Sequence, residues 1–144
     1  MIRGMKRRIR VGILYGGKSA EHEVSIQSAK NIMAAMDEQK YDVIPIYIKR
    51  TDQWLASSTV KRLLSEDVIF PVLHGPYGED GTVQGLLKLL GVPFVGASVL
   101  GSAVGMDKDV MKRLLRDAGI PTPKFLVLHR EEKRTINFQA IKKK

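Results

Sequence analysis

The sequence predicts an α/β fold, a Rossmann-like parallel sheet with helices on both faces. Short apolar segments alternate with longer segments in which apolar residues recur every three or four positions, the pattern of strands alternating with helices. The first apolar segment is mostly uninterrupted, as expected of a strand covered on both sides. At 144 residues the chain has the size of one domain with a normal core.

The first half of this alternation begins with a strand at residues 9–15, which ends in two glycines. Apolar residues at three-to-four spacing then predict a helix over 21–36. Residues 42–48 are β-branched and aromatic, which favours a second strand. Pro45 within it lacks an N–H group, so we expect this strand at an edge of the sheet.

The second half is patterned more weakly at first. Residues 54–65 predict a loop with one or two helical turns, 67–73 a third strand, and 81–90 a helix that Gly91 ends. Residues 94–96 are a candidate for a short strand.

The last elements lead out of this sheet. A small-residue helical turn is expected at 98–105 and an amphipathic helix at 107–118. Pro121 and Pro123 then indicate an extended linker, after which residues 125–128 could open another sheet.

The net charge of +9 lies mainly at the two ends. Residues 1–10 hold five basic residues and no acidic one, and residues 131–144 hold five basic and two acidic residues. Basic ends without interleaved aromatic residues are typical of solvated tails, so we expect no nucleic-acid partner.

Several classes of site are excluded by composition. The chain has no cysteine, hence no disulfide, thiolate metal site or cysteine nucleophile. No apolar run approaches the ~20 residues of a membrane span or forms the core of a signal peptide. We therefore expect a cytoplasmic protein without a membrane partner.

Two polar, glycine-rich turns follow predicted strands, one beginning at Gly16 and Gly17 and the other at His74. The carboxyl ends of parallel strands face a common crevice, so both turns can contribute to one site for a small ligand. Paired glycines let the backbone approach a ligand, and the helix start that follows favours an anion. The first turn has neither the glycine spacing of a dinucleotide fingerprint nor that of a P-loop.

The polar residues of these turns also have structural interpretations. Glu21 could simply complement the dipole of the helix that it precedes. His74 could bind a substrate carboxylate or hold its own loop. For Glu79 and Asp80 we favour a structural role at the start of the next helix, and the acids around His22 lack the spacing of a metal site.

Three ordered motifs, LYGGKSAEHEVS at 14–25, VLHGPYGEDGTVQG at 72–85 and GMDK at 105–108, resemble D-alanine–D-alanine ligase. The resemblance spans about residues 9–129. It implies an ATP-grasp enzyme of cell-wall synthesis, in which ATP phosphorylates the carboxylate of one D-alanine and the amine of a second attacks the acyl phosphate. The complete enzyme would use ATP and magnesium.

The resemblance also implies roles for individual residues. Glu21 would anchor the ammonium of the first D-alanine and is the candidate catalytic residue, Val24 would border the methyl group, and His74 would lie close to the carboxylate. Gly16 and Gly17 would belong to the same substrate site.

The cofactor site has one candidate, Lys108, as a phosphate contact. An exposed helix cation explains this lysine equally well. The resemblance implies no metal ligand among the residues of this chain.

The resemblance further implies three regions: a basic tail at 1–8, an N-terminal substrate-binding (pre-ATP-grasp) domain at 9–120, and a linker with the start of an incomplete ATP-grasp domain at 121–144. Residues 54–66 look shortened relative to longer family members. The chain lacks the family's downstream ATP and magnesium residues, so we expect a truncated fragment that binds no cofactor, binds D-alanine weakly and catalyses no ligation alone. Its partners would be D-alanine and the ATP-grasp domain, and a homodimer is possible.

Two other functions stay open from the sequence. The chain could be a non-catalytic binding or assembly module that acts with a separate ATP-grasp polypeptide. Alternatively it could be an unrelated dinucleotide-binding domain, although the missing glycine fingerprint argues against that.

Overall fold

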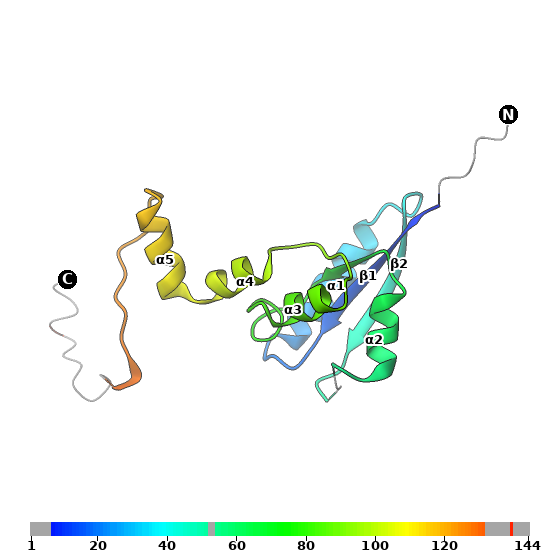
Figure 1. Cartoon of the computed structure of the whole chain (residues 1–144), viewed down its shortest axis with the longest axis horizontal. Coiled ribbons are helices and arrows are strands. Elements are labelled where there is room, and N and C mark those ends of the chain that lie inside the picture. Colours follow the sequence, from blue (N-terminus) through cyan, green and yellow to red (C-terminus); the bar gives the residue numbers. More distant parts are fainter. Residues whose placement is uncertain (1–6, 52–53, 132–138, 140–144) are drawn as a thin grey trace. The chain divides into compact units, whose positions relative to one another are not determined.

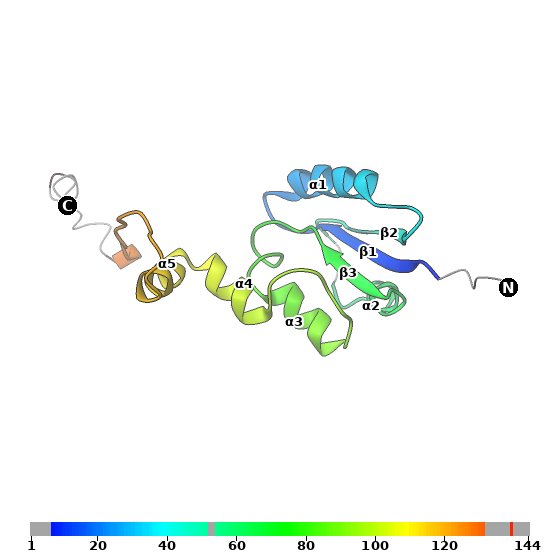
Figure 2. The ribbon, with the colours of Figure 1, turned by 90° about the horizontal axis from the view of Figure 1, so that it is seen from above.

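The computed structural model describes residues 7–51, 54–131 and 139. The chain divides into two compact units, one extending to Asp107 and one beginning at Lys108. In the first unit a parallel sheet has α1 on one face and α2 and α3 on the other (Figures 1 and 2). This arrangement confirms the predicted α/β class with helices on both faces.

The sheet consists of β1 (Ile9–Gly16), β2 (Tyr41–Ile48) and β3 (Val68–Pro71). β1 is central in the order β2-β1-β3, and both neighbours are parallel to it. Its interior residues are buried, which explains why the first apolar run has no polar alternation. Pro45 lies on β2, an edge strand of the sheet, as predicted.

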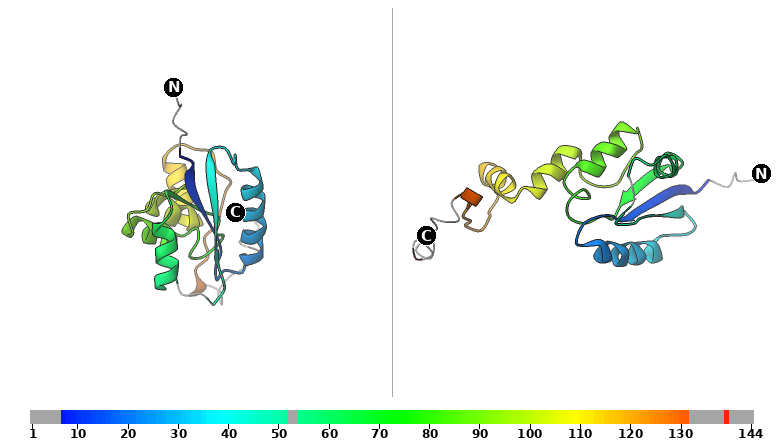
Figure 3. Two further views of the ribbon diagram at one scale, coloured as in Figure 1. Left: turned by 90° about the vertical axis from the view of Figure 1, so that its right-hand side faces the viewer. Right: turned by 90° about the horizontal axis from the view of Figure 1, so that it is seen from below.

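The helices are α1 (His22–Ala35), α2 (Ser57–Leu64), α3 (Thr82–Leu89), α4 (Val99–Met106) and α5 (Lys108–Asp117). The views in Figure 3 show α1 apart from α2 and α3 across the sheet. Among the described residues, no helix combines the length and apolarity needed to cross a membrane.

Each face of the sheet has its own apolar core. On the α1 face, Ile13 and Ala29 are fully buried. On the opposite face, Leu14 of β1 packs in one cluster with Leu63 of α2 and Leu87 of α3. Neighbouring residues of β1 thus point to opposite cores, as the two-residue period of a strand requires.

Two predicted strands differ from the structure. Phe94 forms only an isolated parallel bridge with Ile69, and the chain turns away at Gly96, where φ is +127°. Residues 125–128 form no strand, because no described segment pairs with them. An apolar run makes a strand only where a partner supplies the hydrogen bonds.

The second unit contains α5, which has no buried residue. The family resemblance implies a first domain that ends at residue 120 and therefore includes this helix. The structure instead groups α5 with the residues that follow it. The functional boundary at residue 120 stays a prediction.

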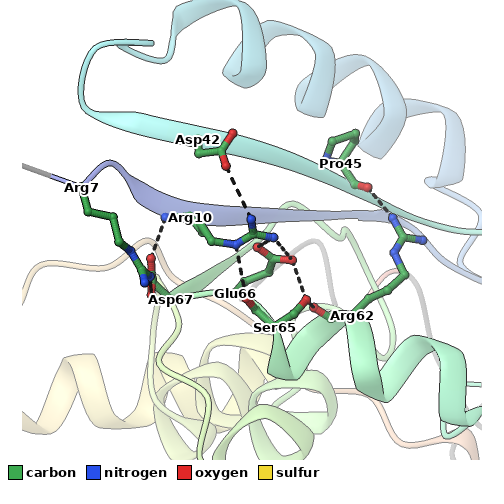
Figure 4. A network of polar contacts seen from close by, with 8 residues as sticks. All are labelled: Arg7, Arg10, Asp42, Pro45, Arg62, Ser65, Glu66 and Asp67. Carbon is green, nitrogen blue, oxygen red and sulfur yellow. Dashed lines mark hydrogen bonds and ion pairs between the residues drawn. The ribbon is translucent and has the colours of Figure 1, made fainter.

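The amino ends of the three strands are joined by a charged network (Figure 4). On β1, Arg10 lies 3.6 Å from Asp42 of β2 and 3.2 Å from buried Oε2 of Glu66, just before β3. The N–H of Arg10 donates to Asp67 at 2.8 Å, and Arg7 pairs with the same carboxylate. These hydrogen bonds, that of Arg10 first, lower the pKa of Asp67. The described end of the predicted basic tail is therefore anchored to the sheet.

Candidate functional site

The first polar turn follows β1 and contains Gly16 and Gly17, with φ values of +95° and +84°. These angles lie in the left-handed region that favours glycine. The N–H of Gly16 donates to Oγ of Ser25, and that of Gly17 to the C=O of Ile48, both at 2.8 Å. Both donors are thus used within the protein, and both glycines are buried, with Ile48 and Leu73 next to the positions where Cβ atoms would lie. A dinucleotide site would instead direct such N–H groups at the pyrophosphate.

Glu21 stands at the start of α1, and its side chain does not cap the helix. A Cβ atom placed on Gly75 would lie 2.7 Å from Oε2 of Glu21, so the carboxylate rests against the backbone of the second turn. The N–H of Glu21 donates to Oγ of Ser19 at 3.1 Å. Its side chain is exposed and available to a ligand.

The second polar turn is held by its own acids. Oε2 of Glu79 accepts from the N–H of Gly75 at 2.7 Å. The two oxygens of Asp80 accept from the N–H groups of Tyr77 at 2.9 Å and Thr82 at 3.0 Å. Partial burial raises the pKa of Asp80, but these hydrogen bonds outweigh it and lower the pKa overall. Asp80 is therefore structural at the start of α3, as predicted, whereas Glu79 is structural within the loop and does not bond to the start of that helix.

His74 lies between α1 and the second turn, with its side chain 30% exposed. Its Nε2 is 3.2 Å from Oγ of Ser28, and its Nδ1 is 3.8 Å from Oε1 of Glu79. The imidazole is therefore oriented from both sides and remains accessible. The structure brings Glu21 and His74 to adjoining turns, since Gly75 follows His74 directly.

The remaining predicted residues lie in two places. Val24 is in the first turn of α1 and 55% exposed, so its side chain is accessible beside Glu21. Lys108 is the first residue of α5 and is exposed, in the other unit. Among the described residues, no three His, Cys, Asp or Glu side chains form a group that could hold a metal ion.

Three residues of α1 in or near the first motif have contacts that the sequence did not predict. Ser25 is fully buried, and its Oγ donates to the C=O of Val72 at 2.5 Å besides accepting from Gly16. Ser28 contacts His74, and His22 is buried against the first turn. Small polar residues on the buried face of a helix are the signal that could have identified them, because such groups need hydrogen-bond partners.

The elements that form these two turns are similar to those of a known protein family. A family model described as the D-ala D-ala ligase N-terminus matches residues 10–66 and 57–97. Those segments contain β1 from its second residue onward, α1, both polar turns and α3.

Two curated relatives show the extent of the similarity. D-alanine–D-alanine ligase of Oceanobacillus iheyensis is 41% identical over 176 aligned residues, covering 96% of this chain and 48% of that protein. The ligase of Solibacter usitatus is 46% identical over 127 residues, covering 86% of this chain and 39% of that protein. The first alignment is longer than the 144 residues of this chain, so that relative has positions without a counterpart here. The predicted location of the shortening, residues 54–66, stays a prediction.

Two solved structures share the fold. D-alanine–D-alanine ligase from Coxiella burnetii superposes with a TM-score of 0.80 at 35% identity, covering 96% of this chain and 49% of that one. The enzyme from Bacillus anthracis complexed with ATP gives 0.78 at 36% identity, covering 96% and 43%.

These comparisons confirm the resemblance that the three motifs indicated. The chain spans about half the length of the curated relatives it matches. It belongs to the D-alanine–D-alanine ligase family, of which it represents the N-terminal domain.

Proposed function

We propose that this chain provides the binding site for the first D-alanine of a D-alanine–D-alanine ligase. The observation that carries the proposal is the position of the Glu21 carboxylate, which lies against Gly75, the residue that directly follows His74. A carboxylate suits the ammonium of a small zwitterion, and an imidazole suits its carboxylate. Holding both ends orients the substrate, which is a large part of what an enzyme gains from binding.

Each predicted residue has a defined part in this proposal. Glu21 accepts hydrogen bonds from the ammonium, and His74, oriented by Ser28, faces the carboxylate. The exposed side chain of Val24 borders the methyl group. The tight turn of Gly16 and Gly17 directs the chain from β1 toward Glu21, with Ile48 and Leu73 packed where Cβ atoms would otherwise lie.

We assign ATP and magnesium to an ATP-grasp domain that acts with this one. Phosphoryl transfer requires a metal ion and cations around the phosphates, which would neutralise charge as the phosphoryl group moves. The described residues contain no group of metal ligands, and within this chain we propose only Lys108 as a phosphate contact. We also propose a cytoplasmic location, because the proposed reaction consumes ATP.

A chimera tests the proposal directly. This chain replaces the corresponding half of the Oceanobacillus iheyensis ligase, and dipeptide formation from D-alanine and ATP is measured. We expect an active chimera in which Glu21→Gln raises KM for the first D-alanine about tenfold or more, as expected for losing a charged hydrogen bond. The matched variant Glu23→Gln, exposed on the same turn of α1, should leave KM unchanged.

Two results would contradict the proposal. One is a Glu21→Gln chimera with the KM of its parent. The other is release of ADP by the purified chain alone from ATP and D-alanine, because the chain would then not depend on an ATP-grasp domain.

A further inference from the structure

His22 is the first residue of α1 and is buried, with 3% of its surface exposed. Its Nδ1 lies 2.6 Å from the carbonyl oxygen of Gly17. Its Nε2 lies 3.1 Å from the hydroxyl of Tyr47 on β2, and the two rings pack edge to face with centroids 5.7 Å apart. Both ring nitrogens therefore have a partner on a different element.

These partners determine where the ring carries its hydrogen. A carbonyl oxygen can only accept, so Nδ1 of His22 must be the donor to Gly17. In the neutral ring Nε2 then has a lone pair, which accepts from the hydroxyl of Tyr47. Free histidine prefers the hydrogen on Nε2, so the fold selects the less common tautomer.

The hydrogen bond from His22 is the third contact that holds the turn of Gly16 and Gly17. The N–H groups of Gly16 and Gly17 are held by Ser25 and Ile48, whereas the C=O of Gly17 is held by His22. Two consecutive glycines with positive φ have more conformational freedom than any other pair. Together these three hydrogen bonds hold the backbone of Gly16 and Gly17 in one conformation as the chain leaves β1.

We propose that His22 is a positioning residue for the first-D-alanine site. Its Nδ1–H group fixes the carbonyl of Gly17 and thereby the direction in which the chain runs to Glu21, whose carboxylate lies against Gly75. The ring is buried and its two nitrogens are engaged, so His22 acts through the backbone rather than by touching substrate. This inference rests on the proposed function and adds a residue to it.

The tautomer provides the first test. Long-range ¹H–¹⁵N NMR of the purified chain near pH 7.5 separates protonated from unprotonated ring nitrogens, and His22→Ala identifies the signals of this ring. We expect Nδ1 to be protonated and Nε2 not. The opposite tautomer would overturn the inference, because Nδ1 could then not donate to Gly17.

Rescue provides the second test. In His22→Asn the side-chain amide nitrogen can take the place of Nδ1 and donate to Gly17, whereas in His22→Ala no donor remains. Titrating each chain with D-alanine by NMR, we expect about tenfold weaker binding for His22→Ala. His22→Asn should bind as the parent does. Equal affinity of parent and His22→Ala, or no rescue by asparagine, would contradict the inference.

The two proposals can fail separately. If the parent chain shows no D-alanine-dependent shifts, the chain does not bind the substrate as proposed. The backbone amide signals of Gly17 and Glu21 then still test the positioning role of His22. Their chemical shifts must change in His22→Ala and return in His22→Asn. If His22→Ala does not fold, His22→Gln replaces it, because its amide lies at the position of Nε2 and does not reach Gly17.

Discussion

Single polar side chains of α1 connect the ends of β1 and β3. The hydroxyl of Ser25 accepts from the N–H of Gly16 and donates to the C=O of Val72, and no part of this residue is exposed. One hydroxyl therefore pairs two buried backbone groups on different turns. Without it both groups would lose their partner away from water, which costs far more than an ordinary surface substitution.

We expect Ser25→Ala to lower the free energy of unfolding by about 1–3 kcal/mol, the cost of leaving buried polar groups unpaired. Urea denaturation of the chain measures this. The control is Ser58→Ala, an exposed serine of α2, which should change stability by less than about 0.5 kcal/mol. Equal effects of the two substitutions would show that Ser25 does not join the turns.

Asp80 gives the second turn a pH-dependent stability. Its pKa is below its ordinary value of 3.8, because the N–H groups of Tyr77 and Thr82 stabilise the carboxylate more than partial burial destabilises it. A lowered folded-state pKa contributes stability that is complete above the unfolded-state pKa and is lost as the pH falls through the folded-state value.

We therefore expect the difference in unfolding free energy between the parent chain and Asp80→Asn to be largest near neutral pH. It should shrink once the pH falls below about 4, where protonation makes Asp80 resemble asparagine. Urea denaturation at a series of pH values between 2 and 7 measures the difference. A difference that is constant over this range would contradict the account.

At the scale of elements, the glycine turn is determined by packing as well as by φ. A Cβ on Gly16 would lie 2.3 Å from the carbonyl oxygen of Ile48, a backbone atom that is fixed in the sheet. A Cβ on Gly85, inside α3, would meet nothing within 4 Å. The same substitution at these two positions therefore has opposite consequences.

Gly16→Ala should destabilise the chain by more than about 2 kcal/mol, because it adds a steric clash to an unfavourable φ. Gly85→Ala should stabilise it by about 0.5–1 kcal/mol, since alanine loses less conformational freedom in a helix. Thermal unfolding of both variants measures the contrast. Tolerance of Gly16→Ala would mean that the chain leaves β1 differently.

The sequence predicts the strands whose own residues carry a clear pattern. The strand at the centre of the sheet has an apolar run ended by glycines, and Pro45 correctly identified β2 as an edge strand. Phe94 and residues 125–128 have strand-like sequences as well, but a strand also needs a partner, and pairing depends on the whole fold.

The candidate site was likewise predictable from the sequence only in part. The meeting of its two turns was predictable, because parallel strands bring their carboxyl ends to one edge. The contact of His22 with Tyr47 was not, because it depends on the register that places Tyr47 opposite Tyr15. The role of Ser25 likewise requires knowing that β1 and β3 are neighbours.

At the scale of the whole molecule, the two units differ in how they are stabilised. The first has apolar cores on both faces of its sheet. In the second, α5 has no buried residue, and Val110 and Leu114 on its apolar face are 40% and 51% exposed. Most helical stability comes from packing of an amphipathic face, so α5 should open far more easily than β1.

Hydrogen exchange of the purified chain measures this difference. We expect the amides of α5 to exchange at least about a hundredfold faster than those of β1, since local opening costs much less than global unfolding. Protection of α5 equal to that of β1 at high protein concentration, but not on dilution, would show instead that a second copy covers its apolar face. That result would establish the homodimer that was considered possible from the sequence.

The central claim is that two turns at the ends of parallel strands hold one small zwitterion. Its most direct test is an NMR titration of the isotope-labelled chain with D-alanine, with L-alanine as the stereochemical control. The account predicts weak binding, as few contacts allow, with shifts concentrated at Glu21, Val24 and His74 that Glu21→Gln abolishes and Glu23→Gln preserves. Shifts that centre elsewhere, or that L-alanine reproduces, would contradict it.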